Sequence, residues 1–346
     1  MTANTPYRTF DENLPDLDGK SILITGGTGS FGRGFLRKIL DNYKPSRLII
    51  FSRDELKQSD MAEETKVADH PSLRYFIGDV RDRSRLEMAM HDVNIVIHAA
   101  ALKQVPAAEY NPMECIHTNV LGAENIVQAA LRTDVTQVIA LSTDKAANPI
   151  NLYGASKLAS DKIFIAANNL SGASGARFSV VRYGNVIGSR GSVVPLFQKL
   201  VAAGADSLPI TDPRMSRFWI TLEQGVNFVL SCLELMKGGE LFVPKIPSMT
   251  VTDMATAVAP ELPHHTIGIR PGEKLHEVMI SEDDSRTTFD LGDRYVIMPA
   301  YKFWSGEEDT QAQGDPVADG FSYTSDGNDE WLGPEALREL MSTPHP

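Results

Sequence analysis

The chain of 346 residues is long enough for one large domain or two modest domains with a substantial hydrophobic core. Its 42% hydrophobic and 23% charged residues are ordinary globular values, and a formal charge of −12 excludes a general nucleic-acid binder, which needs a basic surface. Ten acidic residues lie between positions 305 and 346, where Arg338 is the only Lys or Arg, so the remaining body is nearly neutral.

Two cysteines, Cys115 and Cys232, lie in segments with helical patterns and lack the C-x-x-C spacing of a metal or redox pair. This usage indicates a reducing compartment. No apolar run approaches the roughly 18 residues that span a bilayer, and the polar, acidic N-terminus does not resemble a signal peptide. The sequence therefore predicts a soluble, cytoplasmic protein with no membrane segment.

Six strand-like runs recur between helical patterns in the first half of the chain. They cover residues 21–25, 47–51, 73–77, 94–99, 137–142 and 178–183. This alternation predicts an α/β fold with a doubly wound parallel sheet of the Rossmann type. Proline-punctuated segments follow, which indicates a smaller C-terminal substrate-binding lobe. Within them, a helical pattern at 221–236 and a strand-like run at 240–244 indicate that the chain returns to the main sheet.

The glycine-rich segment TGGTGSFGRGF follows the first strand and opens a helix. Gly27-x-Gly29-x-x-Gly32 fits the general dinucleotide fingerprint, and Gly26-x-x-Gly29-x-x-Gly32 fits the spacing of short-chain dehydrogenases and reductases. In either register, small residues let the backbone approach a pyrophosphate, and the helix N-terminus supplies N–H donors. A dinucleotide site is expected here.

The second strand ends in Ser52-Arg53-Asp54-Glu55-Leu56-Lys57, not in the lone carboxylate that would bind both ribose hydroxyls of NAD. Ser52, Arg53 and Lys57 offer a hydroxyl and two cations to a 2′-phosphate, which favours NADP. Asp54 could still turn inward, and the alternative is a solvated charged loop. With this cofactor, the predicted organisation is an NADP-binding domain of residues 1–185 to which 222–248 return, and a second lobe of 186–221 and 249–346 that includes the acidic tail.

Thr143-Asp144-Lys145 falls just past the carboxyl end of the fifth strand, where open α/β sheets bind ligands. Tyr153 and Lys157 are four residues apart in the next helical segment, so both side chains lie on one face and the ammonium can stabilise a phenolate. That phenolate can take a hydroxyl proton as hydride leaves for a nicotinamide. An acid, a base and a hydride-transfer pair at one site suit a reaction that combines oxidation with elimination.

Further motifs occur in order along the chain: SRDELKQ, GDVRD, HAAALKQVPAAEYNP, LSTDKAANPINLYGASK, RYGNVIGSRGSVVP, SRFWIT, VPKIPSM and RPGEKLHEVMI. With them, the chain resembles an extended short-chain dehydrogenase/reductase. More narrowly, it resembles the inverting UDP-N-acetylglucosamine 4,6-dehydratases that open pseudaminic acid synthesis. The resemblance runs from about Gly19 to Ile280 and is weakest in the acidic tail.

The resemblance implies a redox-neutral dehydration: hydride leaves sugar carbon 4 for NADP+, water is eliminated across carbons 5 and 6, and hydride returns to carbon 6. By this resemblance, Tyr153 acts on the carbon 4 hydroxyl and Lys157 lowers the pKa of Tyr153. Thr143 hydrogen-bonds the same hydroxyl oxygen. Asp144 would be the acid for the carbon 6 hydroxyl and Lys145 the base at carbon 5. Lys145 would have to be neutral, and burial with nearby positive charge makes a neutral amine plausible.

Motif positions and resemblance together also place the binding contacts. Cofactor contacts are expected from Gly26, Thr28, Gly29, Ser30, Phe31, Gly32, Ser52, Arg53, Asp54, Glu55, Leu56, Lys57, Asp79, Val80, Ala99, Ala101, Leu141, Ser142, Tyr153, Lys157, Tyr183 and Val186. Substrate contacts are expected from Lys103, Asn185, Arg217, Arg270 and Glu273, the two arginines for the diphosphate. Glu273 could position either the nucleoside or Arg270.

Other functions stay open at this point. A sugar-nucleotide 4-epimerase needs the same Tyr and Lys pair but has no use for Asp144 and Lys145, and a dehydratase that retains the carbon 5 configuration or an inactive NADP-sensing scaffold are further alternatives. His264-His265 has no third ligand at a metal-like spacing, so no metal is expected. We expect UDP-N-acetylglucosamine as substrate, no nucleic-acid or membrane partner, and a homo-oligomer, either a hexamer or a dimer.

Overall fold

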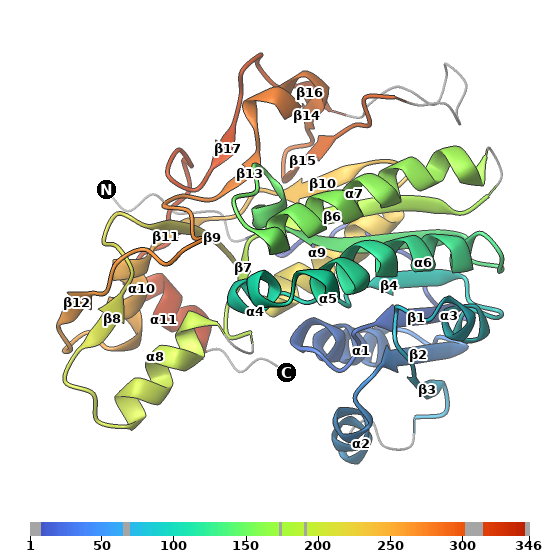
Figure 1. Cartoon of the computed structure of the whole chain (residues 1–346), viewed down its shortest axis with the longest axis horizontal. Coiled ribbons are helices and arrows are strands. Elements are labelled where there is room, and N and C mark those ends of the chain that lie inside the picture. The colour runs from blue at the N-terminus through green and yellow to red at the C-terminus, as the bar shows by residue number, and fades with distance from the viewer. Residues whose placement is uncertain (1–7, 65–69, 173–174, 190–191, 302–313, 343–346) are drawn as a thin grey trace.

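The computed structural model describes residues 8–64, 70–172, 175–189, 192–301 and 314–342. Within these ranges the body is a ten-stranded sheet (Figure 1). Its parallel part has the order β3-β2-β1-β4-β5-β6-β10. The strands are β1 (Ser21–Thr25), β2 (Arg47–Ser52), β3 (Leu73–Ile77), β4 (Ile95–His98), β5 (Gln137–Thr143), β6 (Arg177–Tyr183) and β10 (Leu241–Pro244). The first six match the six predicted runs to within one residue at either end, which confirms the doubly wound sheet.

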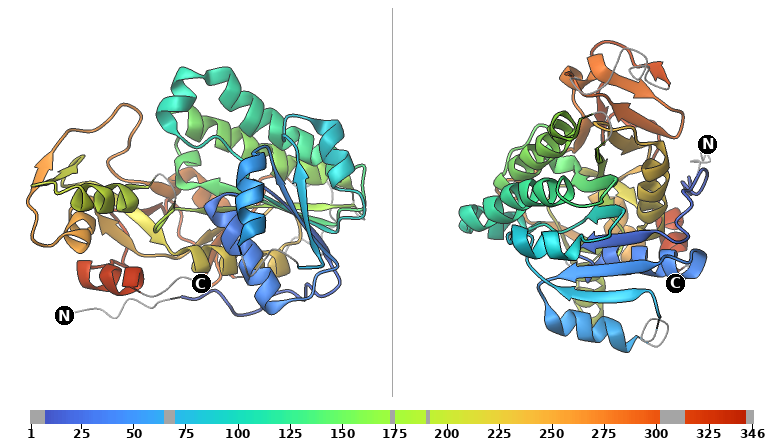
Figure 2. Two further views of the ribbon diagram at one scale, coloured as in Figure 1. Left: turned by 90° about the horizontal axis from the view of Figure 1, so that it is seen from below. Right: turned by 90° about the vertical axis from the view of Figure 1, so that its right-hand side faces the viewer.

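Helices cover both faces of this sheet, as the right-hand view of Figure 2 shows. On one face α6 packs against α3 and α7, and on the other α1 packs against α9. The bounds are α1 (Ser30–Asn42), α2 (Glu55–Glu63), α3 (Arg83–Ala89), α4 (Val105–Tyr110), α5 (Pro112–Ile116), α6 (Gly122–Ala130), α7 (Leu152–Ser171) and α9 (Leu222–Leu235), with a π-helical turn at His117–Leu121. Strands buried on both faces explain their continuous apolar sequences. Across the described ranges, no helix combines the length and apolarity that a bilayer crossing requires.

Three short strands extend the sheet beyond β10: β15 (Arg294–Ile297), β14 (Thr288–Asp290) and β16 (Asp315–Pro316). β15 pairs antiparallel with β10, and β14 pairs antiparallel with β15. The assignment of all of residues 249–346 to the second lobe is therefore wrong for this segment. Strands of two to four residues carry little periodicity, so the sequence pattern could not distinguish them from loops.

The remaining elements form a smaller lobe beside the carboxyl ends of the main strands (Figure 1). It contains the sheet β11-β9-β7 and the pairs β12-β8 and β13-β17. Their bounds are β7 (Asn185–Val186), β8 (Leu208–Ile210), β9 (Ser216–Ile220), β11 (Ser248–Thr250), β12 (His264–Thr266), β13 (Val278–Ile280), β17 (Tyr323–Thr324), α8 (Val193–Ala202), α10 (Val251–Val258) and α11 (Pro334–Ser342). Trp219, Phe197 and Met254 belong to a hydrophobic core of its own. Phe218 of β9, Met279 of β13 and Tyr323 of β17 pack into the core of the main sheet instead, so the smaller lobe has a core of its own and also contributes to the main one.

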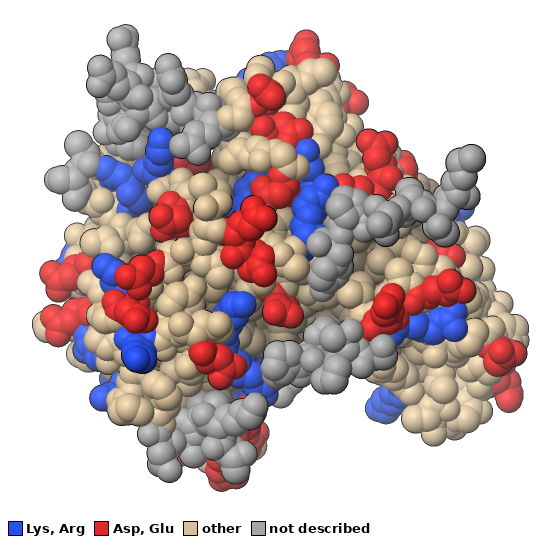
Figure 3. All heavy atoms as spheres, turned by 180° about the vertical axis from the view of Figure 1, so that it is seen from behind, with Lys and Arg blue, Asp and Glu red and all other residues tan. Residues whose placement is uncertain are grey.

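Charged side chains are mixed over the face opposite to the view of Figure 1. Lys and Arg are interspersed with Asp and Glu there (Figure 3). This face offers no broad basic area, in keeping with the acidic balance of the whole chain.

Candidate active site

A cavity of about 610 Å³ opens at the carboxyl ends of the parallel strands, where the strand order reverses between β1 and β4. Most of the predicted site residues line it: Gly26, Thr28, Gly29, Ser30, Phe31, Gly32, Ser52, Arg53, Asp54, Lys57, Val80, Ala99, Ala101, Lys103, Leu141, Ser142, Thr143, Lys145, Tyr153, Lys157, Tyr183, Asn185 and Val186. Seven do not: Asp144, Glu55, Leu56, Asp79, Arg217, Arg270 and Glu273. The structure thus gathers residues from positions 26 to 186 around one space.

The glycine loop between β1 and α1 has a shape that larger residues would disrupt. Gly26 has φ +65°, and a Cβ atom there would lie 2.9 Å from the backbone of Ala100. A Cβ atom on Gly32 would lie 2.2 Å from the carbonyl oxygen of Gly27. Gly29 caps α1 without a side-chain hydrogen bond, and Gly26, Gly29 and Gly32 all line the cavity whereas Gly27 does not. These contacts favour the Gly26-x-x-Gly29-x-x-Gly32 register.

At the end of β2, Asp54 is engaged by the helix that follows. Its carboxylate accepts a hydrogen bond from the Lys57 backbone at 3.0 Å and pairs with Nζ of Lys57 at 2.6 Å, and these contacts lower its pKa. The Arg53 guanidinium lies 3.6 Å from the carboxylate of Asp79. Ser52, Arg53 and Lys57 all border the cavity.

Three cofactor contacts expected in this region are absent from the cavity lining. Glu55 and Leu56 lie in the first turn of α2 and are exposed, with Leu56 71% accessible. Asp79 accepts hydrogen bonds from the backbone and guanidinium of Arg81 at 2.7 to 3.0 Å. The predicted cofactor contacts of these three residues gain no support from the cavity lining and stay predictions.

Tyr153 and Lys157 occupy successive turns of α7, which begins after the Asn151 side chain caps it by accepting from Gly154 N at 2.8 Å. Both side chains are buried and line the cavity. Burial raises the pKa of Tyr153 to about 12, against the opposing effects of the Lys145 charge and the Thr143 hydroxyl. Burial lowers the pKa of Lys157. Burial therefore favours the neutral phenol of Tyr153 and disfavours the charged form of Lys157, one helical turn away.

The triplet Thr143-Asp144-Lys145 forms the last residue of β5 and a single 3₁₀ turn (Asp144–Ala146). The Thr143 hydroxyl donates to Oδ1 of Asp144 at 2.8 Å, and Nζ of Lys145 lies 3.1 Å from the same oxygen. Asp144 is 1% exposed, and its Oδ2 has no hydrogen-bond partner among the described residues. Burial alone would raise the pKa of Asp144, but the charges of Lys145 and Arg217 and the Thr143 hydroxyl hold it below its usual value.

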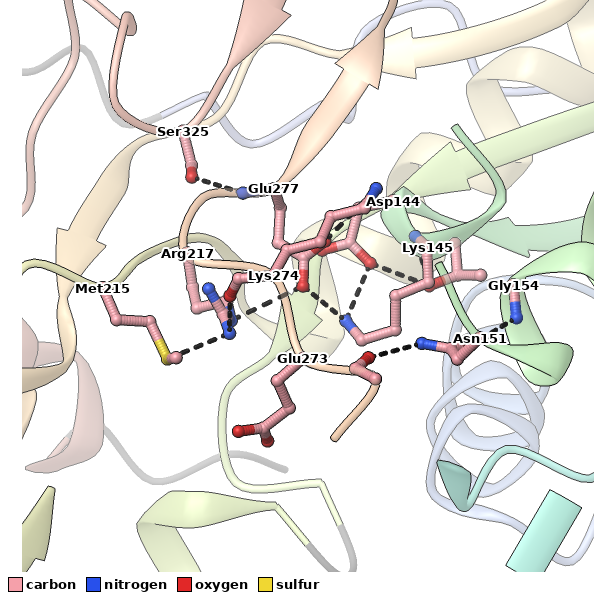
Figure 4. Close-up of polar contacts among 12 residues, drawn as sticks. Asp144, Lys145, Asn151, Gly154, Met215, Arg217, Glu273, Lys274, Glu277 and Ser325 are labelled. Carbon is pink, nitrogen blue, oxygen red and sulfur yellow. Dashed lines mark hydrogen bonds and ion pairs between the residues drawn. The ribbon is translucent and has the colours of Figure 1, made fainter. Parts of the chain in front are cut away.

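Glu277 is a second carboxylate beside Lys145, and sequence reasoning gave it no role. Its Oε1 lies 3.2 Å from Nζ of Lys145 (Figure 4). Burial alone would lower the pKa of Lys145, but Asp144 and Glu277 together raise it. In the described structure the two carboxylates favour the charged form of Lys145. The neutral amine expected for the reaction stays a prediction, which weighed the neighbouring cations but not these two anions.

Arg217 does not face the cavity, contrary to its predicted role as a diphosphate ligand. It is 7% exposed, and its guanidinium donates to the carbonyl oxygens of Ser216, Leu275 and Lys274 at 2.6 to 3.1 Å. Its Nε lies 3.6 Å from Glu277. β9 is a central strand of the second lobe, and this side of it packs against residues 274–277 rather than against the cavity.

The other predicted contacts in the second lobe also lie off the cavity lining. Arg270 has a side chain 65% exposed and pairs with Glu273 at 2.6 Å, and the two roles expected for Glu273 both stay predictions. Lys103 and Asn185 do line the cavity, and burial lowers the pKa of Lys103. Lys103, Asn185 and Lys145 therefore border one cavity, and their contact with a substrate stays a prediction.

Several residues of the site were not predicted. Those that line the cavity are Phe51, Gln104, Thr118, Ser189, Ser192 and Leu222, and those that contact Lys145 or its partners are Glu277 and Lys274. Glu277 and Lys274 belong to the RPGEKLHEVMI motif, and a glutamate directly before the apolar strand β13 was a usable signal of a buried charge. The others become neighbours only through the folded chain.

Comparison with known proteins gives concordant results. The sequence profile of a family described as polysaccharide biosynthesis protein matches residues 22–299. A UDP-N-acetylglucosamine 4,6-dehydratase (inverting) of Campylobacter jejuni is 59% identical over 93% of this chain and 97% of that protein. A UDP-glucose 4-epimerase of Rickettsia canadensis is 44% identical over 80% and 82%.

Solved structures agree on the fold. Pen from Bacillus thuringiensis superposes with a TM-score of 0.86 at 33% identity, covering 95% of this chain and 99% of that one. The dTDP-glucose 4,6-dehydratase DesIV of Streptomyces venezuelae, with NAD and TYD bound, has a TM-score of 0.65 at 22% identity over 74% and 86%. This likeness, the profile match and the identity to the dehydratase confirm the resemblance to extended short-chain dehydrogenases/reductases. The chain therefore belongs to the polysaccharide biosynthesis protein family.

Proposed function

We propose that the protein is a UDP-N-acetylglucosamine 4,6-dehydratase that inverts carbon 5. The observation that carries the proposal is the Asp144 and Lys145 pair, with Nζ 3.1 Å from Oδ1, in which Lys145 lines the same cavity as Tyr153. Oxidation of carbon 4 alone needs a tyrosine and a lysine. A second acid and base at the same cavity is useful only when a hydrogen and a hydroxyl are also removed.

The pair contains the right number of protons for that step. An ammonium beside a carboxylate holds the same protons as an amine beside a carboxylic acid, so a shift across the 3.1 Å hydrogen bond converts one form to the other. The shift is uphill, because the surroundings favour the charged form of both groups. No proton has to enter from solvent. After Lys145 accepts the carbon 5 hydrogen and Asp144 protonates the departing hydroxyl, the ion pair is restored.

Asp144 is 1% exposed and does not line the cavity, whereas the side chain of Lys145 is 27% exposed and does. Delivery of a proton from Asp144 to the sugar therefore needs a local change around the triplet, and substrate entry is the event that we expect to bring it about.

The residues present fit a nicotinamide dinucleotide, here proposed to be NADP. The close approaches at Gly26 and Gly32 leave backbone N–H groups at the start of α1 facing the cavity for a pyrophosphate. Ser52, Arg53 and Lys57 would hold a 2′-phosphate, and Tyr153 and Lys157 would adjoin the nicotinamide ribose. When bound, the cofactor supplies a reversible hydride acceptor. Tyr153, whose pKa is about 12, would take the carbon 4 hydroxyl proton once the positive charge of a bound oxidised nicotinamide lowers that pKa.

A 4-epimerase is the second candidate, because relatives of that name are 44% identical to this chain. Tyr153 and Lys157 would serve an epimerase equally well. Lys145 distinguishes the two proposals, since an epimerase has no proton to remove from carbon 5. A carbon 5-retaining dehydratase is distinguished only by its product.

The decisive experiment is incubation of the purified full chain with UDP-N-acetylglucosamine in deuterated water. We expect a product lighter by one water and carrying deuterium at carbon 5, in the inverted configuration by proton magnetic resonance. An epimer of unchanged composition would establish the second candidate, and retention at carbon 5 would contradict inversion. Light scattering of the same preparation tests the proposed homo-oligomer. Conversion of the product toward pseudaminic acid by later enzymes would support that pathway.

A further inference from the structure

Glu277 is held rigidly at the boundary between the two lobes. Its backbone N–H donates to Oγ of Ser325 at 2.9 Å, and its carbonyl accepts from the Ser325 backbone at 2.9 Å. It directly precedes β13, which pairs with β17. The side chain is 2% exposed and extends from this anchored backbone toward the triplet of the main lobe (Figure 4).

The carboxylate of Glu277 has three cations around it. Oε1 lies 3.2 Å from Nζ of Lys145 and 3.6 Å from Nε of Arg217, and Oε2 lies 4.0 Å from Nζ of Lys274. Oε2 accepts no hydrogen bond from any described residue. Arg217 and Lys274 are held by carbonyl oxygens, Lys274 by that of Ala147 at 2.6 Å. Lys145 is thus the partner of Glu277 that reaches the cavity.

Burying the charged carboxylate of Glu277 costs free energy, and joining the two lobes does not by itself explain that cost. Taking a charge out of water carries a large penalty that an ion pair only partly offsets. The segment that carries Glu277 is already tied to the main lobe by two neutral-acceptor hydrogen bonds, from Asn151 to the Gly272 carbonyl at 2.8 Å and from Lys274 to the Ala147 carbonyl. The lobes are therefore joined without the ion pair between Glu277 and Lys145, and the buried charge of Glu277 calls for a role beyond joining them.

We propose that Glu277 is a positioning residue for Lys145: reaching from the second lobe, its carboxylate fixes Nζ beside Asp144 and stabilises the positive charge that Lys145 gains on removing hydrogen from carbon 5. The inference rests on the proposed function and deepens it. As the C5–H bond breaks, its electron pair moves toward the carbon 4 ketone, and an N–H bond forms on Lys145. Charge appears on Nζ at a point 3.2 Å from a fixed anion.

The role is confined to one step of the reaction. Oxidation at carbon 4 uses Tyr153 and Lys157, neither of which contacts Glu277 through a described hydrogen bond or ion pair. Elimination uses Lys145. Loss of the Glu277 charge should therefore slow exchange at carbon 5 and leave formation of reduced nicotinamide nearly unchanged.

Glu277→Gln tests this in the full chain with NADP and UDP-N-acetylglucosamine. Deuterium exchange at carbon 5 should fall by about 10²-fold, the typical cost of misplacing one catalytic group, while the absorbance of reduced nicotinamide forms at close to the normal rate. Glu240→Gln is the matched control. Glu240 is also buried, but it directly precedes β10 and accepts hydrogen bonds from Ser179 and the backbone of residues 237–238, with no contact to Lys145 among the described hydrogen bonds and ion pairs. It should change stability without changing the ratio of the two rates.

A second measurement needs no turnover. The pH dependence of amine-specific labelling at Lys145 reports its charge, which the facing groups Asp144, Glu277, Arg217, Lys274 and Tyr153 set together. Glu277 raises this pKa, so Glu277→Gln should label at lower pH than the unchanged chain. The pH profile of carbon 5 exchange should move in the same direction.

The outcomes separate the two proposals. If the unchanged chain dehydrates no UDP-sugar, the proposed function fails, and the labelling shift alone decides whether Glu277 controls Lys145. If the unchanged chain is active, equal losses in both steps or unaltered exchange in Glu277→Gln would overturn the positioning role. An unshifted labelling profile would overturn it in either case.

Discussion

The two ends of the cavity are built by different means. At the cofactor end, the shape of the backbone determines the site. A Cβ atom added to Gly26 or Gly32 would lie 2.9 or 2.2 Å from other backbone atoms, so only glycine fits at these positions. At the sugar end, charged side chains determine the site. Nζ of Lys145 lies 3.1 Å from Asp144 and 3.2 Å from Glu277, and Nε of Arg217 lies 3.6 Å from Glu277. The first end can be altered by adding a methyl group and the second by removing a charge.

The difference teaches where chemistry can vary within this fold. A backbone cradle contributed by consecutive residues binds the same pyrophosphate in many enzymes. A charge cluster shared between lobes can change the reaction through one or two side chains. The relatives at 59% and 44% identity are named as a dehydratase and as an epimerase.

The largest expected effect comes from breaking the charged end. Lys145→Ala should lower carbon 5 exchange by about 10³-fold, because general base catalysis typically contributes 10²- to 10⁴-fold. Binding of NADP should persist, since the glycine loop is untouched. Exchange is measured by proton magnetic resonance and binding by calorimetry.

Lys162→Ala is the matched control for that variant. Lys162 is an exposed lysine on α7, outside the cavity lining, and its loss should leave both quantities unchanged. Normal turnover by Lys145→Ala would show that Lys145 is not the base, and the 4-epimerase would then be the favoured function.

The two ends also differ in how far the sequence predicts them. The strands and the glycine loop follow from patterns within some ten residues, so their positions were predicted to within one residue. Tyr153 and Lys157 follow from helical spacing. Glu277 and Lys145 are 132 positions apart, and no local pattern encodes their contact. Arg217 was misassigned for the same reason: its direction depends on which side of β9 meets residues 274–277.

A smaller effect comes from altering the shape-determined end. Gly32→Ala should destabilise the protein by about 1–3 kcal/mol, the usual cost of overpacking, because the added Cβ would lie 2.2 Å from the Gly27 carbonyl oxygen. The same shift of the loop should weaken NADP binding. Chemical unfolding and calorimetry measure the two effects.

Gly225→Ala, near the start of α9, provides the opposite case. No atom lies within 4 Å of a Cβ added there, so the alanine should stabilise the helix by about 0.5–1 kcal/mol. Equal stabilities for the two variants would show that the approach at Gly32 is not restrictive.

The smallest expected effect concerns the choice between NADP and NAD. Arg53→Ala should reduce the preference for NADP by about fivefold, which corresponds to roughly 1 kcal/mol, the upper end for an exposed charge pair. The effect is modest because the guanidinium is half exposed and already shared with Asp79 at 3.6 Å. Affinities for both cofactors, measured by calorimetry at low salt, give the ratio.

Arg83→Ala removes a cation of the same type from α3, where it pairs with Glu87 at 3.5 Å outside the cavity lining. It should leave the ratio of the two affinities unchanged. If Arg53→Ala weakens NAD and NADP equally, Arg53 contacts a part that both cofactors share, and the 2′-phosphate assignment is wrong. A ratio that falls only for Arg53→Ala, and less at high salt, is what direct pairing with a phosphate requires, because screening weakens an exposed pair. That result would show that at the cofactor end backbone shape fixes where the dinucleotide lies, while one exposed charge selects which dinucleotide it is.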